Sequence, residues 1–94
     1  MRYEWDKKKS DENLRTRGFD FAHATLIFDG RVRQHEDRRR DYGEHRVIAT
    51  GVAEGRLLTV VYTDRDVFDG LVRRIISARL SNPRERHLYG QAHI

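Results

Sequence analysis

Two β-rich runs joined by a short segment that begins and ends with glycine restrict the fold of this chain more than any other feature. The runs are Arg46–Thr50 and Leu57–Thr63, and residues 51–55 separate them. Both runs are rich in β-branched and aromatic residues, and the second alternates its apolar side chains between two faces. This pattern predicts a β-hairpin. Turn residues at 64–66 and 69–70 then introduce a further predicted strand over 71–77.

Capping residues predict three helices. Asp6 is a favoured N-cap and Gly18 a favoured C-terminal residue for the first helix, and Asp20 is a favoured N-cap for the second. For the third helix, Asn82 matches an N-cap, Pro83 the first helical position and Glu85 the acid of a capping box. The predicted helices cover residues 7–17, 21–28 and 83–90.

The order of these elements predicts an α+β fold. Residues 2–5 are aromatic enough for a first strand, and the charged residues 31–43 form either an edge strand or a loop. The expected architecture is a small antiparallel sheet of three to four strands, with the helices packed on one face. The length of 94 residues corresponds to a single domain, residues 1–94.

The charged residues are dominated by arginine. The chain has 19 basic and 15 acidic residues, for a formal charge of +4, and all but Lys7, Lys8 and Lys9 of the basic ones are arginine. Arginine matches phosphate with a planar fork of donors, although a GC-rich genome also raises arginine content.

The absence of cysteine excludes disulfides and thiolate catalysis. No signal peptide or membrane-spanning run is evident, so a cytoplasmic location is predicted.

Histidines and local charge clusters do not indicate a metal or cofactor. The five histidines lack metal-ligand spacing and are interpreted as polar surface residues (His23, His35, His45, His87 and His93). His45 stands between Glu44 and Arg46. Strand alternation places Glu44 and Arg46 on one face and His45 on the other. By itself this pattern indicates an ion pair beside an edge histidine. The run Arg38–Arg40 predicts a solvated loop that could equally contact RNA, without a catalytic role.

The segment from Arg74 to Tyr89 offers groups that suit a phosphodiester. It contains Arg74, Arg79, Glu85 and Tyr89, which supply guanidinium groups, a carboxylate and a phenol. The two arginines are five residues apart, so an unbroken regular strand would place them on opposite faces. We expect a strand break at residues 77–78 to let both reach one edge. Spacing alone slightly favours a structural interpretation of this segment.

Nearly the whole chain, in order, resembles the BrnT family, which comprises small ribonuclease toxins of bacterial type II toxin–antitoxin systems. The matching elements are Glu4-Trp5-Asp6 with Lys9 and Asn13, Gly18 and Phe21 with Ala24 and Phe28, Gly43-Glu44 with Arg46 and Gly51, Leu58 to Thr63 with Arg65, and Arg74-Ile75-Ile76-Ser77-Ala78-Arg79 with Glu85-Arg86 and Tyr89. Two departures stand out. Lys7 stands where the family usually has proline, and Arg17 stands where it commonly has histidine. Because arginine cannot act as a base at neutral pH, Arg17 cannot replace that histidine in such a role.

The resemblance implies a RelE-like fold and a metal-independent endoribonuclease that arrests growth by cutting RNA. It also implies a BrnA-type antitoxin that neutralises the toxin and carries the complex to operator DNA. The alternative from the residues alone is a non-catalytic small basic module that binds RNA or DNA.

The predicted site combines the residues of the resemblance with the chemistry of metal-free RNA cleavage, in which the ribose 2′-OH attacks the adjacent phosphate. The predicted catalytic residues are Arg79, Arg74, Arg65, Glu44, Glu85 and Tyr89. The predicted RNA-binding residues are Lys9, Arg46 and His45. Glu44 and Glu85 are alternatives for the base, if one is needed. No cofactor is predicted.

Overall fold

A computed structural model describes residues 1–91 of the chain. One five-stranded sheet forms its centre, with strand order β1-β5-β4-β3-β2. The strands are β1 (Arg2–Trp5), β2 (Arg33–Glu36), β3 (Val47–Ala53), β4 (Arg56–Val67) and β5 (Gly70–Leu80). The helices are α1 (Lys7–Arg17), α2 (Phe21–Ala24) with the 3₁₀ segment η1 (Thr25–Asp29), and α3 (Pro83–Gln91).

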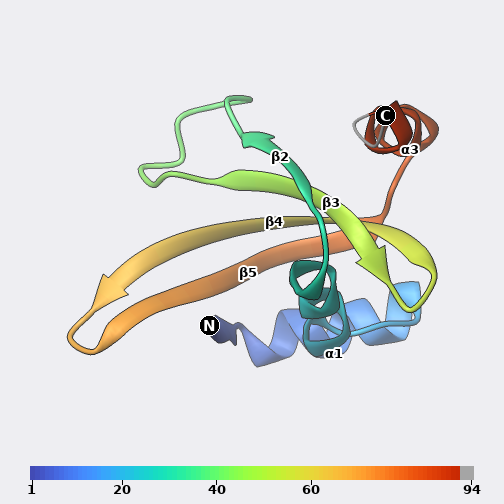
Figure 1. The fold of residues 1–94 in the computed structure, drawn as a ribbon. Coiled ribbons are helices and arrows are strands. Elements are labelled where there is room, and N and C mark those ends of the chain that lie inside the picture. The colour runs from blue at the N-terminus through green and yellow to red at the C-terminus, as the bar shows by residue number, and fades with distance from the viewer. Residues whose placement is uncertain (92–94) are drawn as a thin grey trace.

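The α+β class is confirmed, but the sheet differs from the predicted one. It has five strands instead of three to four, and it is mixed because β1 pairs with β5 in parallel. The strands β2 to β5 form the antiparallel meander. The helices do not all share one face, since α2 and η1 pack on the core face, whereas α3 lies on the opposite side of the sheet, where its Glu85 pairs with Arg79 (Figure 1).

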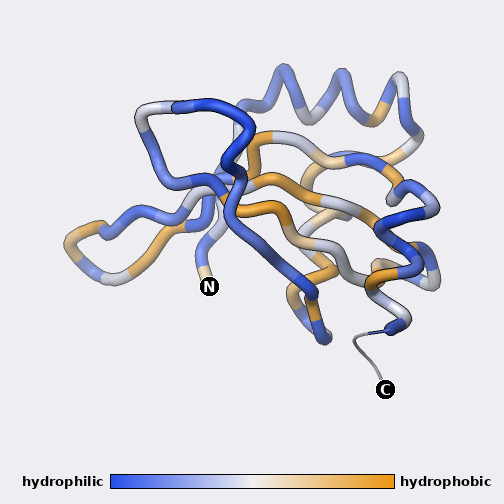
Figure 2. The backbone as a smooth tube through the Cα atoms, turned by 90° about the horizontal axis from the view of Figure 1, so that it is seen from above, coloured by the Kyte–Doolittle hydropathy of each residue, from blue (hydrophilic) through white to orange (hydrophobic). Residues whose placement is uncertain are grey.

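The hydrophobic core lies between the sheet and the segment from Phe19 to η1. Phe21 and Ile27 are buried there against Leu58 and Val60 of β4 and Ala78 of β5. Figure 2 shows this division along the chain, with hydrophobic central strands and a hydrophilic stretch through β2 and the loop after it.

Helix α1 packs through polar side chains. Its apolar Leu14 is half exposed, whereas Ser10 and Asn13 are buried. The Ser10 hydroxyl accepts a hydrogen bond from the Phe21 backbone amide, and the Asn13 side-chain amide donates to the Phe19 carbonyl. These bonds fix α1 against the turn that leads into α2, so the helix needs little apolar surface of its own.

The predicted caps are confirmed. The Asp6 carboxylate accepts from the Lys9 amide, and Gly18 adopts the left-handed conformation that ends α1. Asp20 caps α2 in the same way. At the start of α3, Asn82 and Glu85 each accept a hydrogen bond from the other's backbone amide, which is a capping box.

A β-bulge in β5 replaces the predicted strand break. Tyr62 pairs with Ile75 and Val61 pairs with Ser77, so Ile76 is an extra residue and β5 continues to Leu80. The prediction that residues 77–78 interrupt the strand is therefore wrong. The extra residue reverses the alternation of side chains, so Arg74 and Arg79 lie on the same face despite their odd spacing.

Candidate functional site

The face of the sheet opposite the core carries most of the residues predicted to be functional. Cross-strand pairs define it: Thr59 faces Arg79, Val61 faces Ser77, and Thr63 faces Arg74. Beyond these pairs, Arg65 lies on the same face by alternation. We call this surface the open face. The bulge at Ile76 is the local feature that brings both arginines of β5 onto it.

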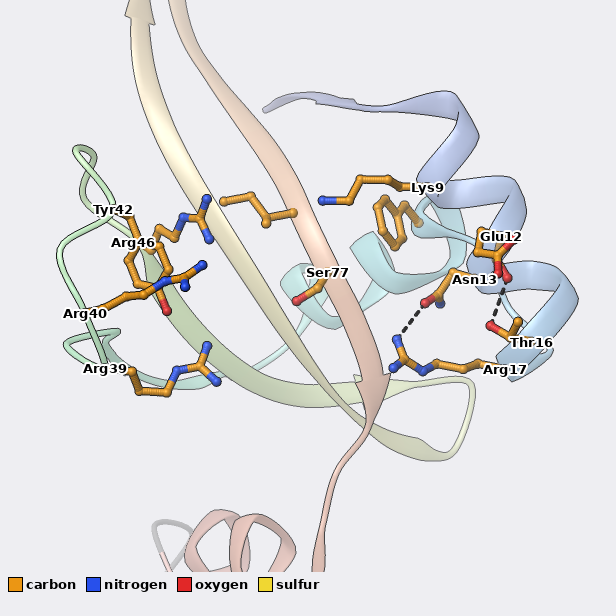
Figure 3. A pocket seen from close by; sticks show the side chains of 12 residues that line it. Lys9, Glu12, Asn13, Thr16, Arg17, Arg39, Arg40, Tyr42, Arg46 and Ser77 are labelled. Atoms are coloured by element: carbon orange, nitrogen blue, oxygen red, sulfur yellow. Dashed lines mark hydrogen bonds between the residues drawn. The ribbon is translucent and has the colours of Figure 1, made fainter.

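A cavity of about 730 Å³ lies on the open face. Figure 3 shows side chains of α1 on one of its sides, those of the loop before β3 on the other, and Ser77 of β5 between them. We call it the arginine hollow. It is lined by Lys9, Glu12, Asn13, Thr16, Arg17, Phe21, Arg39, Arg40, Tyr42, Arg46, Ile76 and Ser77.

The charge of the arginine hollow is strongly positive. Five of its lining side chains are cationic, namely Lys9, Arg17, Arg39, Arg40 and Arg46, and the single acidic one is Glu12. Concentrating positive charge in a concave surface raises its attraction for anions above that of isolated surface charges. A polyanion such as a nucleic-acid backbone therefore fits this hollow electrostatically.

The loop before β3 is held in place by internal ion pairs. Arg39 donates two hydrogen bonds of 2.8 Å to the fully buried carboxylate of Asp37, whose backbone amide donates to the Arg46 carbonyl. The hydrogen bonds from Arg39 outweigh burial and lower the pKa of Asp37 to about 2. The Arg46 guanidinium lies 4.1 Å from the centre of the Tyr42 ring, and its Nε donates to Glu44 over 2.8 Å. The loop thus presents its arginines in fixed positions.

Arg17 occupies the position at which the resemblance implies a histidine, and it lines the hollow from the α1 side. Its guanidinium donates to the Asn13 side-chain oxygen and to the Ala78 backbone carbonyl, both over 3.0 Å. The second bond joins α1 to β5 beyond the end of β1. Arg17 therefore has a structural function in addition to its charge in the hollow.

Glu4 of β1 connects two of the predicted catalytic arginines. Arg65 donates to both carboxylate oxygens of Glu4, with a shortest distance of 2.7 Å, and Arg74 lies 3.8 Å from the same group. Sequence reasoning did not assign Glu4 to the site, because the parallel pairing of β1 with β5 is needed to place it opposite Arg74.

Arg79 is bound by Glu85 at the start of α3. The two groups form a bidentate pair with distances of 2.7 and 2.9 Å. Burial raises the pKa of the Glu85 carboxyl, but the hydrogen bonds from Arg79 and the Asn82 backbone amide outweigh burial and hold that pKa below its usual range. A carboxylate stabilised in this way is a weak proton acceptor.

The remaining predicted residues lie at the margins of the open face or away from it. His45 is exposed, and its Nδ1 lies 3.2 Å from a carboxylate oxygen of Glu36. Tyr89 is buried, and its hydroxyl donates to the Arg31 carbonyl while the Arg31 guanidinium lies 4.0 Å from the centre of its ring. Neither side chain lines the arginine hollow.

Two residues of the hollow were underestimated from the sequence. Arg39 and Arg40 belong to the run that was interpreted as a solvated loop without a catalytic role, yet both line the cavity. The available signal was that acids flank the arginine run (Glu36 and Asp37 before it, Asp41 after it), because such acids can pair with the arginines and hold the loop in one conformation.

The histidines and acids of residues 1–91 include no group of three or more that is placed to hold a metal ion. His35, His45 and His87 are exposed, as predicted, whereas His23 is half-buried with its ring 5.9 Å from that of Phe19. His93 lies outside the described residues.

Within residues 1–91, no helix has the length and apolar character needed to cross a membrane.

The fold and the arginine hollow define a class: a small α+β domain with a concentrated basic surface. A family model described as "Ribonuclease toxin, BrnT, of type II toxin-antitoxin system" matches residues 5–85. The chain therefore belongs to the BrnT family of ribonuclease toxins, which confirms the resemblance. A type II system implies an antitoxin as partner. The comparison with curated proteins finds no match.

Proposed function

We propose that this protein is an endoribonuclease toxin that cleaves RNA at the arginine hollow without a metal ion and is neutralised by a BrnA-type antitoxin. The observation that supports this most directly is the placement of five cationic side chains around one concave surface beside Arg74 and Arg79. Guanidinium groups can stabilise the charge that develops on a phosphate during cleavage, which is the role a metal ion has in other nucleases.

The proposed reaction is attack of a ribose 2′-oxygen on the adjacent phosphorus. The new bond is between phosphorus and the 2′-oxygen, and the bond to the 5′-oxygen of the next nucleotide breaks. The products are a 2′,3′-cyclic phosphate and a 5′-hydroxyl end. The 2′-hydroxyl proton passes to a base, and the departing oxygen receives a proton from an acid.

In this proposal the arginines bind the phosphate and stabilise the transition state. Arg46 contributes from the hollow itself, while Arg74 and Arg79 contribute from β5 on either side of Ser77. Arg65 supports Arg74 through their shared partner Glu4. Phosphate can replace a carboxylate as the partner of these arginines because both anions accept the same bidentate hydrogen bonds.

Proton transfer is assigned to Glu44 and Lys9. Glu44 is preferred over Glu85 as the base because it accepts one hydrogen bond, from Arg46 of the hollow, whereas Glu85 accepts three, two from Arg79 and one from the Asn82 amide. The Lys9 ammonium group lines the hollow and makes no ion pair within residues 1–91, so it is available as the proton donor. His45 contributes to RNA binding at the margin, and Tyr89 anchors α3.

The test combines growth and RNA cleavage. Induced expression should arrest growth, and co-expression of the neighbouring antitoxin gene should relieve the arrest. The purified protein should degrade RNA at substoichiometric amounts in the presence of EDTA, leaving cyclic phosphate ends. A protein that retards RNA on a gel without cleaving it would instead be a binding module, and the proposed function would be wrong.

A further inference from the structure

A second cavity, of about 620 Å³, lies between β2, β3 and the start of α3. Arg33 of β2 contributes to its lining, as does Thr50, its partner on β3. Arg84 and Glu85 contribute from α3. We call this cavity the second hollow. Because Thr50 pairs with Thr59, which pairs with Arg79, the second hollow lies on the open face, like the arginine hollow.

The arginines of the second hollow are available to an external anion. Within residues 1–91, neither Arg33 nor Arg84 forms an ion pair or a side-chain hydrogen bond. The one acid of the lining, Glu85, already accepts both hydrogen bonds of Arg79. The chain thus presents two uncommitted guanidinium groups around one cavity, with His35 beside them.

Arg39 connects the two hollows, because its side chain lines both. It is fixed by the bidentate pair with Asp37, whose carboxylate is completely buried, while the Arg39 side chain itself is about two-thirds exposed (66%). A ligand that extends from one hollow to the other would therefore pass a positioned cation midway. Neighbouring phosphates of a single strand form such an extended anion, and both hollows together offer it a continuous basic surface.

We propose that the second hollow is a phosphate subsite for the RNA strand that flanks the cleaved nucleotide, with Arg33 and Arg84 as its ligands. This inference rests on the proposed function, because it assumes that the arginine hollow holds the reactive phosphate. The substrate class that follows is a single-stranded RNA several nucleotides long. A strand too short to pass Arg39 would occupy the arginine hollow alone and leave the second hollow without a ligand.

The test measures binding rather than cleavage. Two 2′-O-methylated RNA oligonucleotides, a short one and one several times longer, lack the nucleophile and cannot be cleaved by the proposed reaction. The wild-type protein should bind the longer oligonucleotide more tightly. The double variant Arg33→Gln/Arg84→Gln should lose this preference, with an affinity for the longer strand about tenfold lower, because one charge-assisted hydrogen bond is enough for that factor.

The salt dependence gives a second readout. The slope of log affinity against log salt should fall by about 0.7 for each phosphate contact that the double variant loses on the longer strand. Affinity for the short strand should not change. The matched control is Arg2→Gln/Arg56→Gln, which removes the same charge from residues that line neither hollow, one paired with Asp69 and the other packed near Phe19.

Several outcomes would overturn the inference. Equal wild-type affinity for both oligonucleotides would show that the second hollow holds no phosphate. So would a double variant that behaves like the control, provided that its circular dichroism spectrum matches that of the wild type. A variant that keeps the length preference but binds the antitoxin more weakly would assign the surface to a protein partner. If the wild type binds neither oligonucleotide, the subsite inference fails, whereas the proposed function fails only if unmodified RNA is not cleaved.

Discussion

Replacing Arg79 with alanine tests how the open face stabilises both the fold and the transition state. The substitution removes a bidentate partner from Glu85, whose side chain is only 18% exposed. Leaving a largely buried carboxylate without that partner should cost about 2 kcal/mol, within the usual range for an unsatisfied buried group. For a domain of this size, the melting temperature should then fall by roughly 8–16 °C.

The effect of Arg79→Ala on cleavage should be larger than its effect on folding. Loss of one group that stabilises transition-state charge typically lowers the rate by about 10²–10³. The assay is RNA cleavage under single-turnover conditions, at a temperature well below the melting point of the variant. If Arg79→Ala cleaves RNA at the wild-type rate while folded, Arg79 does not stabilise the transition state.

Glu85→Gln separates the two functions of this pair. Glutamine retains an oxygen that can accept the hydrogen bond from the Asn82 amide, but it releases Arg79 from its ionic partner. If Arg79 binds phosphate and Glu44 is the base, the variant should cleave RNA at least as fast as the wild type. A loss of about 10² or more in rate would identify Glu85 as the base and contradict the assignment to Glu44.

Three further outcomes follow from the packing and electrostatics. Gly51→Ala should destabilise the fold by about 1–3 kcal/mol, because the added Cβ would lie 2.9 Å from Ile27 Cβ. Gly90→Ala is the control, since its added Cβ would meet open space and should not destabilise the fold, and thermal melts compare the two variants. The pKa of Asp37 is lowered to about 2, so its pair with Arg39 stabilises the fold above about pH 4, and this contribution disappears as the pH falls towards 2. Asp37→Asn should remove that part of the pH dependence in melts across the same range; unchanged acid sensitivity would contradict it.

Local signals in the sequence predicted much of the fold. The N-caps at Asp6, Asp20 and Asn82 depend on residues within one helical turn, and all three helix starts were found. The strands β3 and β4 were also found from alternation over a few residues, but both run further than predicted, because residues 51–53 and 64–66 were predicted as turns and lie in the strands. What the sequence did not predict depends on contacts between distant residues, such as the parallel pairing of Glu4 with Arg74.

The candidate site illustrates the same limit. The residues of β5 were identified, but the reason that Arg74 and Arg79 share a face was predicted incorrectly. A bulge at Ile76 has no glycine or proline to mark it, because it arises from the register with β4. The loop arginines Arg39 and Arg40 were given no catalytic role, since only the folded loop brings them towards α1.

In the proposed function, the arginine hollow cleaves RNA without a metal ion. The most direct test of this claim is the single-turnover cleavage rate of Arg46→Gln in EDTA, beside the wild type and Arg56→Gln, a matched control whose guanidinium lies over Phe19 on the other face. The wild type and the control should cleave RNA at equal rates, and Arg46→Gln should be slower by about 10² or more. Equal rates for all three proteins, or loss of wild-type cleavage in EDTA, would contradict the claim.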